Sequence, residues 1–316
     1  MSGVESSQNR FDAWLRPISP AARLGALRAL VGGFVLIYLI ARFAHLWRLS
    51  RLPSGQFQPT GILSLLDQSL AGWQWHLVLI ATAILSLTFA LGIKHRVLAP
   101  LFALALLITI SYRNSWGMIF HTENLMVLHV GILAFAPAAD GWSWDQHVGR
   151  AERPDSWRYG WPIFLMSAVA VISYTLAGYA KLRYGGLSWG SGEVLRNYVA
   201  MDNLRKILLG DTFSPLAAPA MRLDLAFTFL ASGSLALELL APISLLSRRF
   251  ARLWVPAMVG FHLGIVALMA IVFPYPLSGV AFASFYRCEK LMERLARTKW
   301  GRSLAKRLKS PVKTPT

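Results

Sequence analysis

The sequence holds a single cysteine, Cys288, among its 316 residues. One cysteine cannot form an intrachain disulfide, a CxxC redox pair or a thiolate metal cluster, so these three features are excluded. Charged residues are also scarce, at 15% of the chain, whereas a soluble domain carries about a quarter. Apolar residues make up 55% and gather in long runs. This composition predicts a polytopic membrane protein without a separate soluble domain.

Acidic residues are few: 15 Asp and Glu stand against 32 Lys and Arg, which gives a formal net charge of +17. Such an excess is found in nucleic-acid-binding proteins, but here much of it follows the last apolar run. From Arg287 onwards Lys and Arg are frequent, and the only acids are Glu289 and Glu293. A basic segment directly after a membrane helix usually faces anionic lipid. We therefore expect the lipid bilayer as partner, anionic lipid at the tail, and no nucleic acid.

The first apolar run begins near Ala26 and is long enough to cross a bilayer, and no short apolar stretch with a small-residue cleavage site precedes it. We expect this run to be a retained helix. Eight apolar segments follow one another along the chain, at residues 26–47, 75–93, 97–113, 122–139, 162–182, 224–246, 253–273 and 276–287. The eighth is shorter than the roughly 20 residues of a spanning helix, so it either extends beyond Arg287 or is re-entrant. The sequence thus predicts an all-α polytopic bundle of about seven to eight transmembrane helices.

Lys and Arg also predict the orientation of this bundle. They are more frequent in one alternate set of connecting segments, residues 1–25, 94–96, 140–161, 247–252 and 287–316, than in the opposite set. The positive-inside rule then places both termini in the cytoplasm. We expect a cytoplasmic N-terminal segment at 1–25, a transmembrane domain at 26–287 and a basic cytoplasmic tail at 288–316, in a multi-pass protein of the cell membrane.

Two of the predicted outer loops are long. One covers residues 48–74, and the other, residues 183–223, contains "WGSGEVLRNYVAMDNLRKILL", which is typical of one or two amphipathic helices on the membrane surface. Long loops in a compact membrane protein are usually functional. We expect the two loops to roof a site on the outer face.

Ionisable residues inside the apolar runs are candidates for function, because they are costly in a bilayer and usually face the bundle interior. Glu238 lies deep in the sixth segment and should be protonated or paired with a cation such as Arg42. Arg42 shares a helix face with His45, and it either takes part in a site or extends outward to water. His262 lies in the middle of the seventh segment, as a core histidine or as part of a site.

Lys181 and His121 fall on the same side of the membrane in this topology. Lys181 is either an interfacial anchor or a base, since burial favours the neutral amine of a lysine. His121 lies at the outer mouth of the fourth segment, and its spacing of eight residues from His129 is only weak support for haem or metal. We expect no metal site.

The order of several motifs resembles the vitamin K-dependent gamma-carboxylase family and the wider group of horizontally transferred transmembrane (HTTM) proteins. These motifs are "AGYAKL" followed by "SWGSGEVLRNY", "HTENLMVLHVGILAFAPAADGWSWD", "ELLAPISLL" and "FHLGIVALMAIVFPY". The resemblance covers roughly residues 20–285. A looser resemblance, in size and general pattern, is to sporulation-delaying protein B, a bacterial membrane relative that acts in the maturation of a secreted toxic peptide.

The resemblance implies roles for particular residues. Lys181 takes the place of the lysine that acts as base toward vitamin K hydroquinone, and His121 and His262 align with two histidines of the carboxylase. Lys181 and His121 are therefore the catalytic candidates. The candidates for binding a cofactor, which would be reduced vitamin K or menaquinone, are His262, Tyr174, Glu238 and Arg42. The carboxylase carries a large lumenal domain that grips its protein substrate, whereas this chain continues into a short basic tail, which disfavours carboxylation of a protein.

Three functions remain open at this point. An enzyme requires Lys181 to face the bundle interior near His121. A non-catalytic partner in the maturation or export of a small secreted peptide requires Lys181 to point toward lipid headgroups. A transporter would use Glu238 and Arg42 as a site at the membrane midplane, but the sequence shows neither repeated halves nor paired broken helices.

Overall fold

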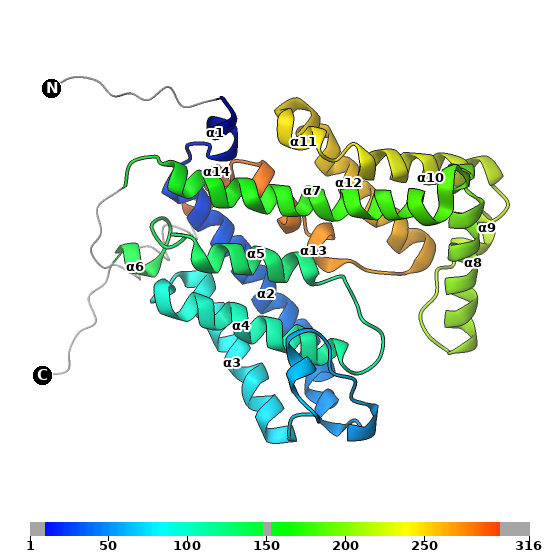
Figure 1. Cartoon of the computed structure of the whole chain (residues 1–316), viewed down its shortest axis with the longest axis horizontal. Helices are drawn as coiled ribbons and strands as arrows, with labels where there is room; N and C mark the ends of the chain where they lie inside the picture. The colour runs from blue at the N-terminus through cyan, green and yellow to red at the C-terminus, as the bar shows by residue number, and fades with distance from the viewer. Residues whose placement is uncertain (1–9, 148–152, 298–316) are drawn as a thin grey trace, which may run out of the picture. The chain divides into compact units, whose positions relative to one another are not determined.

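The computed structural model describes residues 10–147 and 153–297 of the chain (Figure 1). The described residues are helical and contain no strand; a single isolated bridge joins Ser19 to Ser156. The predicted all-α class is confirmed for this part of the chain. Most of the predicted basic tail, residues 298–316, lies outside the described residues.

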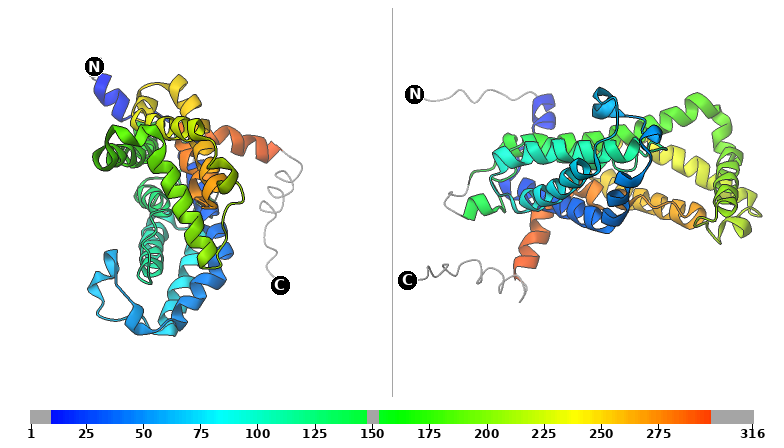
Figure 2. Two further views of the ribbon diagram at one scale, coloured as in Figure 1. Left: turned by 90° about the vertical axis from the view of Figure 1, so that its right-hand side faces the viewer. Right: turned by 90° about the horizontal axis from the view of Figure 1, so that it is seen from below.

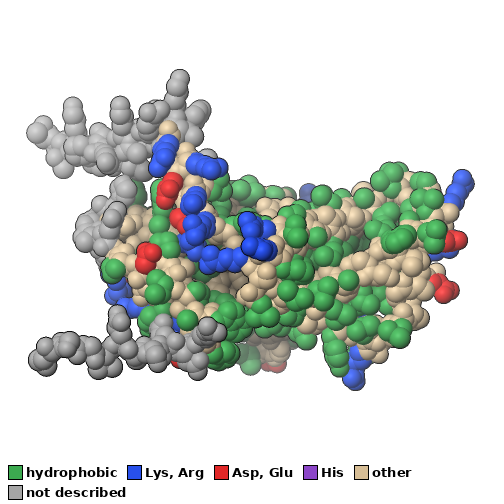
Figure 3. All heavy atoms as spheres, turned by 90° about the horizontal axis from the view of Figure 1, so that it is seen from above, with side chains coloured by type: hydrophobic (Ala, Val, Ile, Leu, Met, Phe, Trp, Pro, Cys, Tyr) green, Lys and Arg blue, Asp and Glu red, His purple; other side chains and the backbone are tan. Residues whose placement is uncertain are grey.

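Five helices are long and apolar enough to cross a membrane. They are Ala21–Arg51, Gly72–Leu91, His95–Asn114, Trp157–Ser191 and Arg248–Met269. Each coincides with a predicted apolar segment. Figure 3 shows hydrophobic side chains over much of one face of the molecule, interrupted by a group of Lys and Arg left of its centre. An apolar exterior of this kind suits contact with lipid tails.

The chain divides into two compact units. The first comprises residues 1–116, 130–164 and 286–316, and the second comprises residues 117–129 and 165–285. Helices α5 (Asn124–Phe135) and α7 (Trp157–Gly185) contribute residues to both units.

The first unit is built on three long helices, in which α2 packs on α3 and α3 packs on α4. Its other helices are short. The bounds are α1 Arg10–Leu15, α2 Ala21–Arg48, α3 Gly72–Leu91, α4 His95–Asn114, α6 Trp144–His147 and α14 Cys288–Arg297, with 3₁₀ turns at Leu49–Arg51, Ser54–Gln56 and Gly61–Leu65. Helix α3 ends at Gly92, whose φ of 70° favours glycine. A Cβ there would lie 2.6 Å from the Ser143 Cβ and 2.7 Å from the Arg28 Nη1, so the close packing also requires glycine.

Arg28 holds this end of the first unit together. Its side chain is fully buried, and it donates to the carbonyl oxygens of Phe89, Ala90, Ala138 and Trp142 at 2.5–3.0 Å. The carbonyls of Phe89 and Ala90 lie in the last turn of α3, where carbonyl oxygens lack the N–H partner four residues on that they have in the helix interior. Arg28 is therefore not an interfacial anchor: the guanidinium is a buried cap for α3 and for the turn after α5.

Helix α14 packs on α2 through an ion pair. Arg23 Nε donates to Glu289 Oε2 at 3.0 Å and Arg23 Nη2 donates to Glu289 Oε1 at 2.9 Å. Cys288 beside it is buried. Burial by itself would raise the pKa of Glu289, but the hydrogen bonds and the charge of Arg23 outweigh that effect and the pKa is lowered. Burial also raises the pKa of the Cys288 thiol to about 11, which makes this thiol inert at neutral pH.

The docking of α14 should therefore fail in acid. Because the folded protein lowers the pKa of Glu289, its stabilising effect is complete above the ordinary value of about 4.3 and is lost as pH falls through the lowered folded value. The reaction of Cys288 with 4,4′-dithiodipyridine, which works in acid, reports undocking. We expect slow labelling at pH 7, fast labelling in strong acid, and faster labelling at pH 7 in Glu289→Gln. Equally slow labelling of Glu289→Gln would contradict this account.

The second unit contains the rest of α7 and the helices after it. Their bounds are α8 Glu193–Leu208, α9 Ala217–Ala220, α10 Asp224–Leu239, α11 Ile243–Leu246, α12 Arg248–Met269 and α13 Pro274–Leu277, with 3₁₀ turns at Gly186–Ser191 and Val280–Phe285. Helix α8 runs across the direction of α10 and α12 (Figure 2). Asn203 Nδ2 on α8 donates to the carbonyl of Leu268 at 2.9 Å, and Lys206 donates to that of Met269, so α8 caps the end of α12. The predicted amphipathic helix in residues 183–223 is confirmed; its contact with the membrane surface stays a prediction.

Two predicted segments are interrupted. Residues 224–246 were expected to be one helix, but α10 ends at Leu239 and α11 begins at Ile243. Pro242 lies between the two and lacks the N–H that would continue the helix, so it ends α10 rather than kinking it. Residues 276–287 form the end of α13 and a 3₁₀ turn instead of a long helix. The side chains from Ala281 to Ser284 in this turn are buried.

Candidate functional site

The centre of the candidate site is an ion pair between Lys181 on α7 and Glu238 on α10. Lys181 Nζ donates to Glu238 Oε1 at 2.7 Å. The Glu238 side chain is 3% exposed and the Lys181 side chain 19% exposed. A buried carboxylate needs a cation, and the sequence analysis named Arg42 as an example. The structure shows that the cation is Lys181, so the lysine faces a carboxylate inside the second unit and does not act as a free interfacial anchor.

The spacing of residues along α7 explains how Lys181 reaches this position. Tyr174, Gly178 and Lys181 are separated by four and three residues, which places them on one face of the helix. Gly178 is the point of closest approach, because a Cβ there would lie only 2.9 Å from the Glu238 Cβ. The glycine of the "AGYAKL" motif thus lets α10 come near enough for Glu238 to meet Lys181.

Aromatic side chains enclose the ammonium group. Lys181 Nζ lies 5.2 Å from the centroid of the Trp189 ring and 5.5 Å from that of the Phe261 ring. Trp189 belongs to the 3₁₀ turn after α7, and Phe261 belongs to α12. Both rings stabilise the charged lysine by cation–π attraction and limit the access of water. Lys181 and Glu238 are joined directly by a hydrogen bond, so the ion pair is the chemical unit of this site.

A second polar contact lies next to this pair. The Tyr174 hydroxyl and His262 Nε2 form a hydrogen bond of 2.8 Å, and both side chains are buried. Trp254 packs edge-on against Tyr174 and donates its indole N–H to the carbonyl of Leu237, the residue before Glu238. His262 is therefore a bonded residue of the site interior, and the structure brings Tyr174, Glu238, Lys181 and His262 together.

His121 reaches the same region through aromatic rings. The Phe273 ring centroid lies 5.9 Å from that of His121 and 5.1 Å from that of His262, and Phe261 is next to His262 in sequence. A row of rings thus extends from Lys181 through Phe261, His262 and Phe273 to His121. His121 itself is exposed and precedes the first residue of α5, Asn124. It lies at the mouth of the site, and no hydrogen bond joins it to Lys181.

Three buried polar atoms of the site have no hydrogen-bond partner among the described residues. They are Glu238 Oε2, His262 Nδ1 and Trp189 Nε1. Buried polar groups in proteins are nearly always satisfied, so three unsatisfied atoms in one site call for an explanation. A ligand with hydroxyl or carbonyl groups, or a proton received by the carboxylate, would satisfy them.

Arg42 and His129 do not belong to this group of contacts. Arg42 is exposed on α2, in the first compact unit. His129 is buried, with Nδ1 bonded to the Tyr275 hydroxyl at 2.8 Å and Nε2 bonded to the Met166 carbonyl at 3.0 Å. Because a carbonyl only accepts, Nε2 carries the proton and Nδ1 accepts from Tyr275. This histidine is a structural link between α5, α7 and α13. No group of three His, Cys, Asp or Glu among the described residues could hold a metal ion.

The comparison with protein families agrees with the resemblance noted in the sequence. A family model described as the HTTM domain matches residues 15–288, which is most of the chain. The chain belongs to the HTTM family. No curated protein and no solved structure matches it. Together with its apolar helices, the HTTM domain indicates an integral membrane protein.

Several residues of this HTTM site were not among the sequence candidates. Trp189, Phe261 and Trp254 form its walls, and Phe273 links His121 to the interior. The spacing of Trp254 and His262 by eight residues, close to two helical turns, was a signal that these two share a face. No pattern in the sequence predicted that Trp189 would fold back over Lys181, because that contact depends on the turn after α7.

Proposed function

We propose that this HTTM protein is a membrane enzyme that takes a proton from a reduced quinone at the Lys181–Glu238 pair. The observation that carries the proposal is the ion pair itself: a carboxylate with one oxygen bound by Lys181 and the other buried and unpartnered. A carboxylate oxygen with no partner can accept a proton, and an ammonium group beside it can stabilise the anion left behind. Reduced vitamin K and menaquinone have the phenolic hydroxyl groups for such a transfer.

The roles of the side chains follow from their positions. Glu238 Oε2 receives the proton, so the carboxylate becomes neutral and releases Lys181. The Lys181 ammonium then pairs with the oxyanion, which keeps one positive and one negative charge in the site throughout. Tyr174 and His262 supply a hydrogen-bonding wall, in which His262 Nδ1 is available to the ligand. The quinone, when bound, supplies the redox chemistry with dioxygen that the carboxylase resemblance implies.

The residues that line the site fit a flat aromatic ligand. Trp189 and Phe261 flank the ammonium, and Tyr174 stacks on Phe282 with ring centroids 5.9 Å apart. Aromatic faces and a few converging polar atoms are typical of sites for small apolar molecules. His121 at the mouth is positioned to exchange protons with water outside the site, which is a role consistent with its exposure.

We propose further that both termini are cytoplasmic, in the cell membrane, as the positive-inside rule predicts. Support comes from the first unit, where Glu289 after the last apolar segment pairs with Arg23 at the start of the first spanning candidate. The chain therefore returns to its starting side after an even number of crossings. Helices α5 and α10, of 12 and 16 residues, join the five longer helices. The buried segment from Pro274 to Phe285 completes the return, since irregular backbone is tolerated within a membrane where protein surrounds it.

The test is oxygen-dependent epoxidation of reduced menaquinone or vitamin K by the purified protein in detergent. We expect turnover by the wild type and a loss of about 100-fold or more in Lys181→Met and in Glu238→Gln, because each removes one half of the proton-accepting unit. Arg183→Met is the matched control: it removes a cation from an exposed position two residues from Lys181 and should retain full activity.

The outcomes separate the enzyme from the non-catalytic partner. Turnover that depends on Lys181 and Glu238 but not on Arg183 supports the enzyme. No turnover of either quinone by well-folded wild type would overturn it. That result would favour a non-catalytic membrane partner in the maturation or export of a small secreted peptide.

A further inference from the structure

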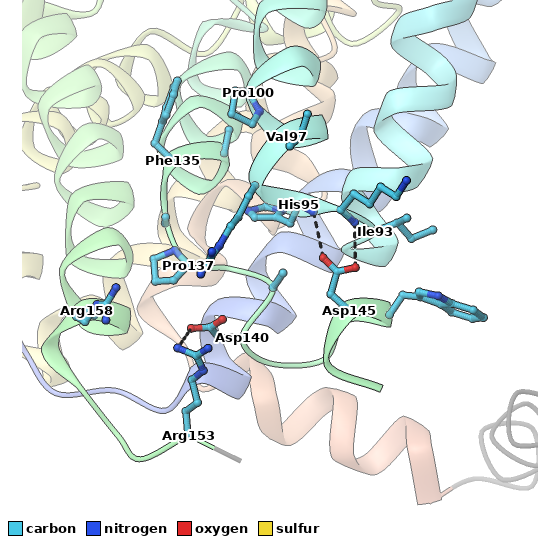
Figure 4. A pocket seen from close by; sticks show the side chains of 16 residues that line it. Ile93, His95, Val97, Pro100, Phe135, Pro137, Asp140, Asp145, Arg153 and Arg158 are labelled. Carbon is cyan, nitrogen blue, oxygen red and sulfur yellow. Dashed lines mark hydrogen bonds and ion pairs between the residues drawn. The ribbon is translucent and has the colours of Figure 1, made fainter. Parts of the chain in front are cut away.

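A pocket in the first unit contains no residue of the Lys181 site and is not used by the proposed chemistry. It has a volume of about 880 Å³ and is formed by the start of α4, the turn after α5, α6, and the start of α7 (Figure 4). Four basic residues line it: Lys94, Arg96, Arg153 and Arg158. Among the described residues, only two acids, Asp140 and Asp145, contribute to the same lining.

Both acids are already engaged in the fold. Asp145 accepts hydrogen bonds from the backbone N–H groups of Lys94 and His95 at 3.0 and 3.1 Å, so it caps the first turn of α4. Asp140 pairs with Arg153 at 3.1 Å and accepts a hydrogen bond from the Tyr159 hydroxyl at 3.1 Å. Figure 4 shows the two contacts of Asp145 and the Asp140–Arg153 pair as dashed lines. The acids therefore position backbone and one arginine and do not neutralise the other cations.

Three cations are left over. Lys94, Arg96 and Arg158 are exposed side chains, and no carboxylate in the described part of the chain pairs with any of them. They come from two separate stretches of sequence and converge on one hollow. Positive charge around a pocket that is open to solvent attracts an anion. The N–H groups of an arginine guanidinium can bind two oxygens of a phosphate group at once.

The rest of the pocket wall includes exposed apolar side chains, which indicates an anion that also has an apolar part. Val97 is 64% exposed and Phe135 is 76% exposed, and both line the pocket next to the cations. Trp144, in the same lining, is 48% exposed. Tryptophan is typical of the level at which lipid headgroups meet the acyl chains. A free phosphate would use the cations but not these apolar side chains, whereas a phospholipid would use both.

The position of the pocket in the fold also favours a phospholipid. It is built where spanning candidates end: α4 begins at His95, and α7 begins at Trp157. Arg28 joins this end of the unit to the start of α2, which the predicted topology places on the cytoplasmic side. The cytoplasmic leaflet is the one rich in anionic lipid.

We propose that this pocket is a specific binding site for the headgroup of an anionic phospholipid, held by Arg96, Arg158 and Lys94 through its phosphate. The acyl chains lie along Val97 and Phe135. The site is separate from the basic tail, for which general attraction to anionic lipid was predicted, and it does not depend on the proposed enzyme function.

Native mass spectrometry of the delipidated protein in detergent tests the site, with phosphatidylglycerol, phosphatidylcholine and inorganic phosphate as separate probes. We expect tight binding of phosphatidylglycerol only. The double variant R96Q/R158Q should weaken it by roughly 20-fold, since each basic residue near the surface contributes about a factor of five. R96K/R158K keeps the charge and should retain most of the binding.

The matched control is R51Q/R222Q, which removes two exposed cations outside the pocket and should leave binding unchanged. Elution profile and thermal unfolding verify that every variant is folded. Equal binding of phosphatidylcholine, or equal binding of phosphatidylglycerol by R96Q/R158Q, would overturn the site. Binding of inorganic phosphate with the same dependence on Arg96 and Arg158 would overturn the lipid and assign a soluble phosphate compound instead.

Discussion

Replacing Arg28 by methionine should lower the free energy of unfolding by about 4 kcal/mol, one of the largest effects of any single substitution in the chain. The methionine fills part of the volume but donates no hydrogen bond. The carbonyls of Ala90, Ala138 and Trp142 would then lose the donor that Arg28 supplies, and that of Phe89 would keep only the N–H of Gly92. Each hydrogen bond from a charged group contributes about 1.5–3 kcal/mol, and the contributions of one guanidinium are not additive.

The measurement is unfolding in mixed detergent micelles, followed by tryptophan fluorescence. Arg28→Lys should recover only part of the lost free energy of unfolding, because one ammonium group cannot replace a planar guanidinium that donates to four carbonyl oxygens. Arg51→Met, at an exposed position, is the control and should change the free energy of unfolding by less than about 0.5 kcal/mol. A loss of under about 1 kcal/mol in Arg28→Met would show that the four contacts do not hold this end of the unit.

The second large effect is expected at the Lys181–Glu238 pair. Lys181→Met leaves a buried carboxylate without its cation, and the cost of breaking a buried pair in this way is about 3–5 kcal/mol. The double variant K181M/E238L replaces both charges by apolar groups of similar length and should restore stability to near that of the wild type. The same unfolding experiment measures both variants, and Glu238→Leu completes a double-mutant cycle.

The cycle separates a coupled pair from two independent residues. If the pair is real, the losses of the single variants are much larger than that of the double variant. Losses that simply add would mean that Lys181 and Glu238 do not interact, and the candidate site would lose its centre. Activity adds a second readout, because K181M/E238L should be stable but inactive if the pair is the proton-accepting unit.

Much of the helical framework could be predicted from the sequence, because long apolar runs have few alternatives in a membrane protein. The five spanning candidates coincide with predicted segments. The interruptions could not be placed so well. Residues 224–246 were expected to be one helix, but α10 ends before Pro242. Residues 276–287 contain the end of α13 and a 3₁₀ turn, in which the surrounding protein buries the side chains from Ala281 to Ser284.

The site was only partly predictable for a related reason. Lys181, Glu238, Tyr174 and His262 were all candidates, yet which of them meet depends on the close approach of α7 and α10 at Gly178. Arg42 was a reasonable partner for Glu238 by charge alone, and Arg28 a reasonable anchor by its place near a helix end. Charge and position along a helix do not show which carbonyl or carboxylate a neighbouring element brings into reach.

The central claim is that Glu238, paired with Lys181, receives the proton of a reduced quinone, and infrared difference spectroscopy measures this transfer directly. Addition of reduced menaquinone to the wild type under exclusion of oxygen should produce the carbonyl stretch of a newly protonated carboxyl group, and Glu238→Gln should lack this band. A band of the same intensity in Glu238→Gln, or no band in quinone-loaded wild type, would contradict the account.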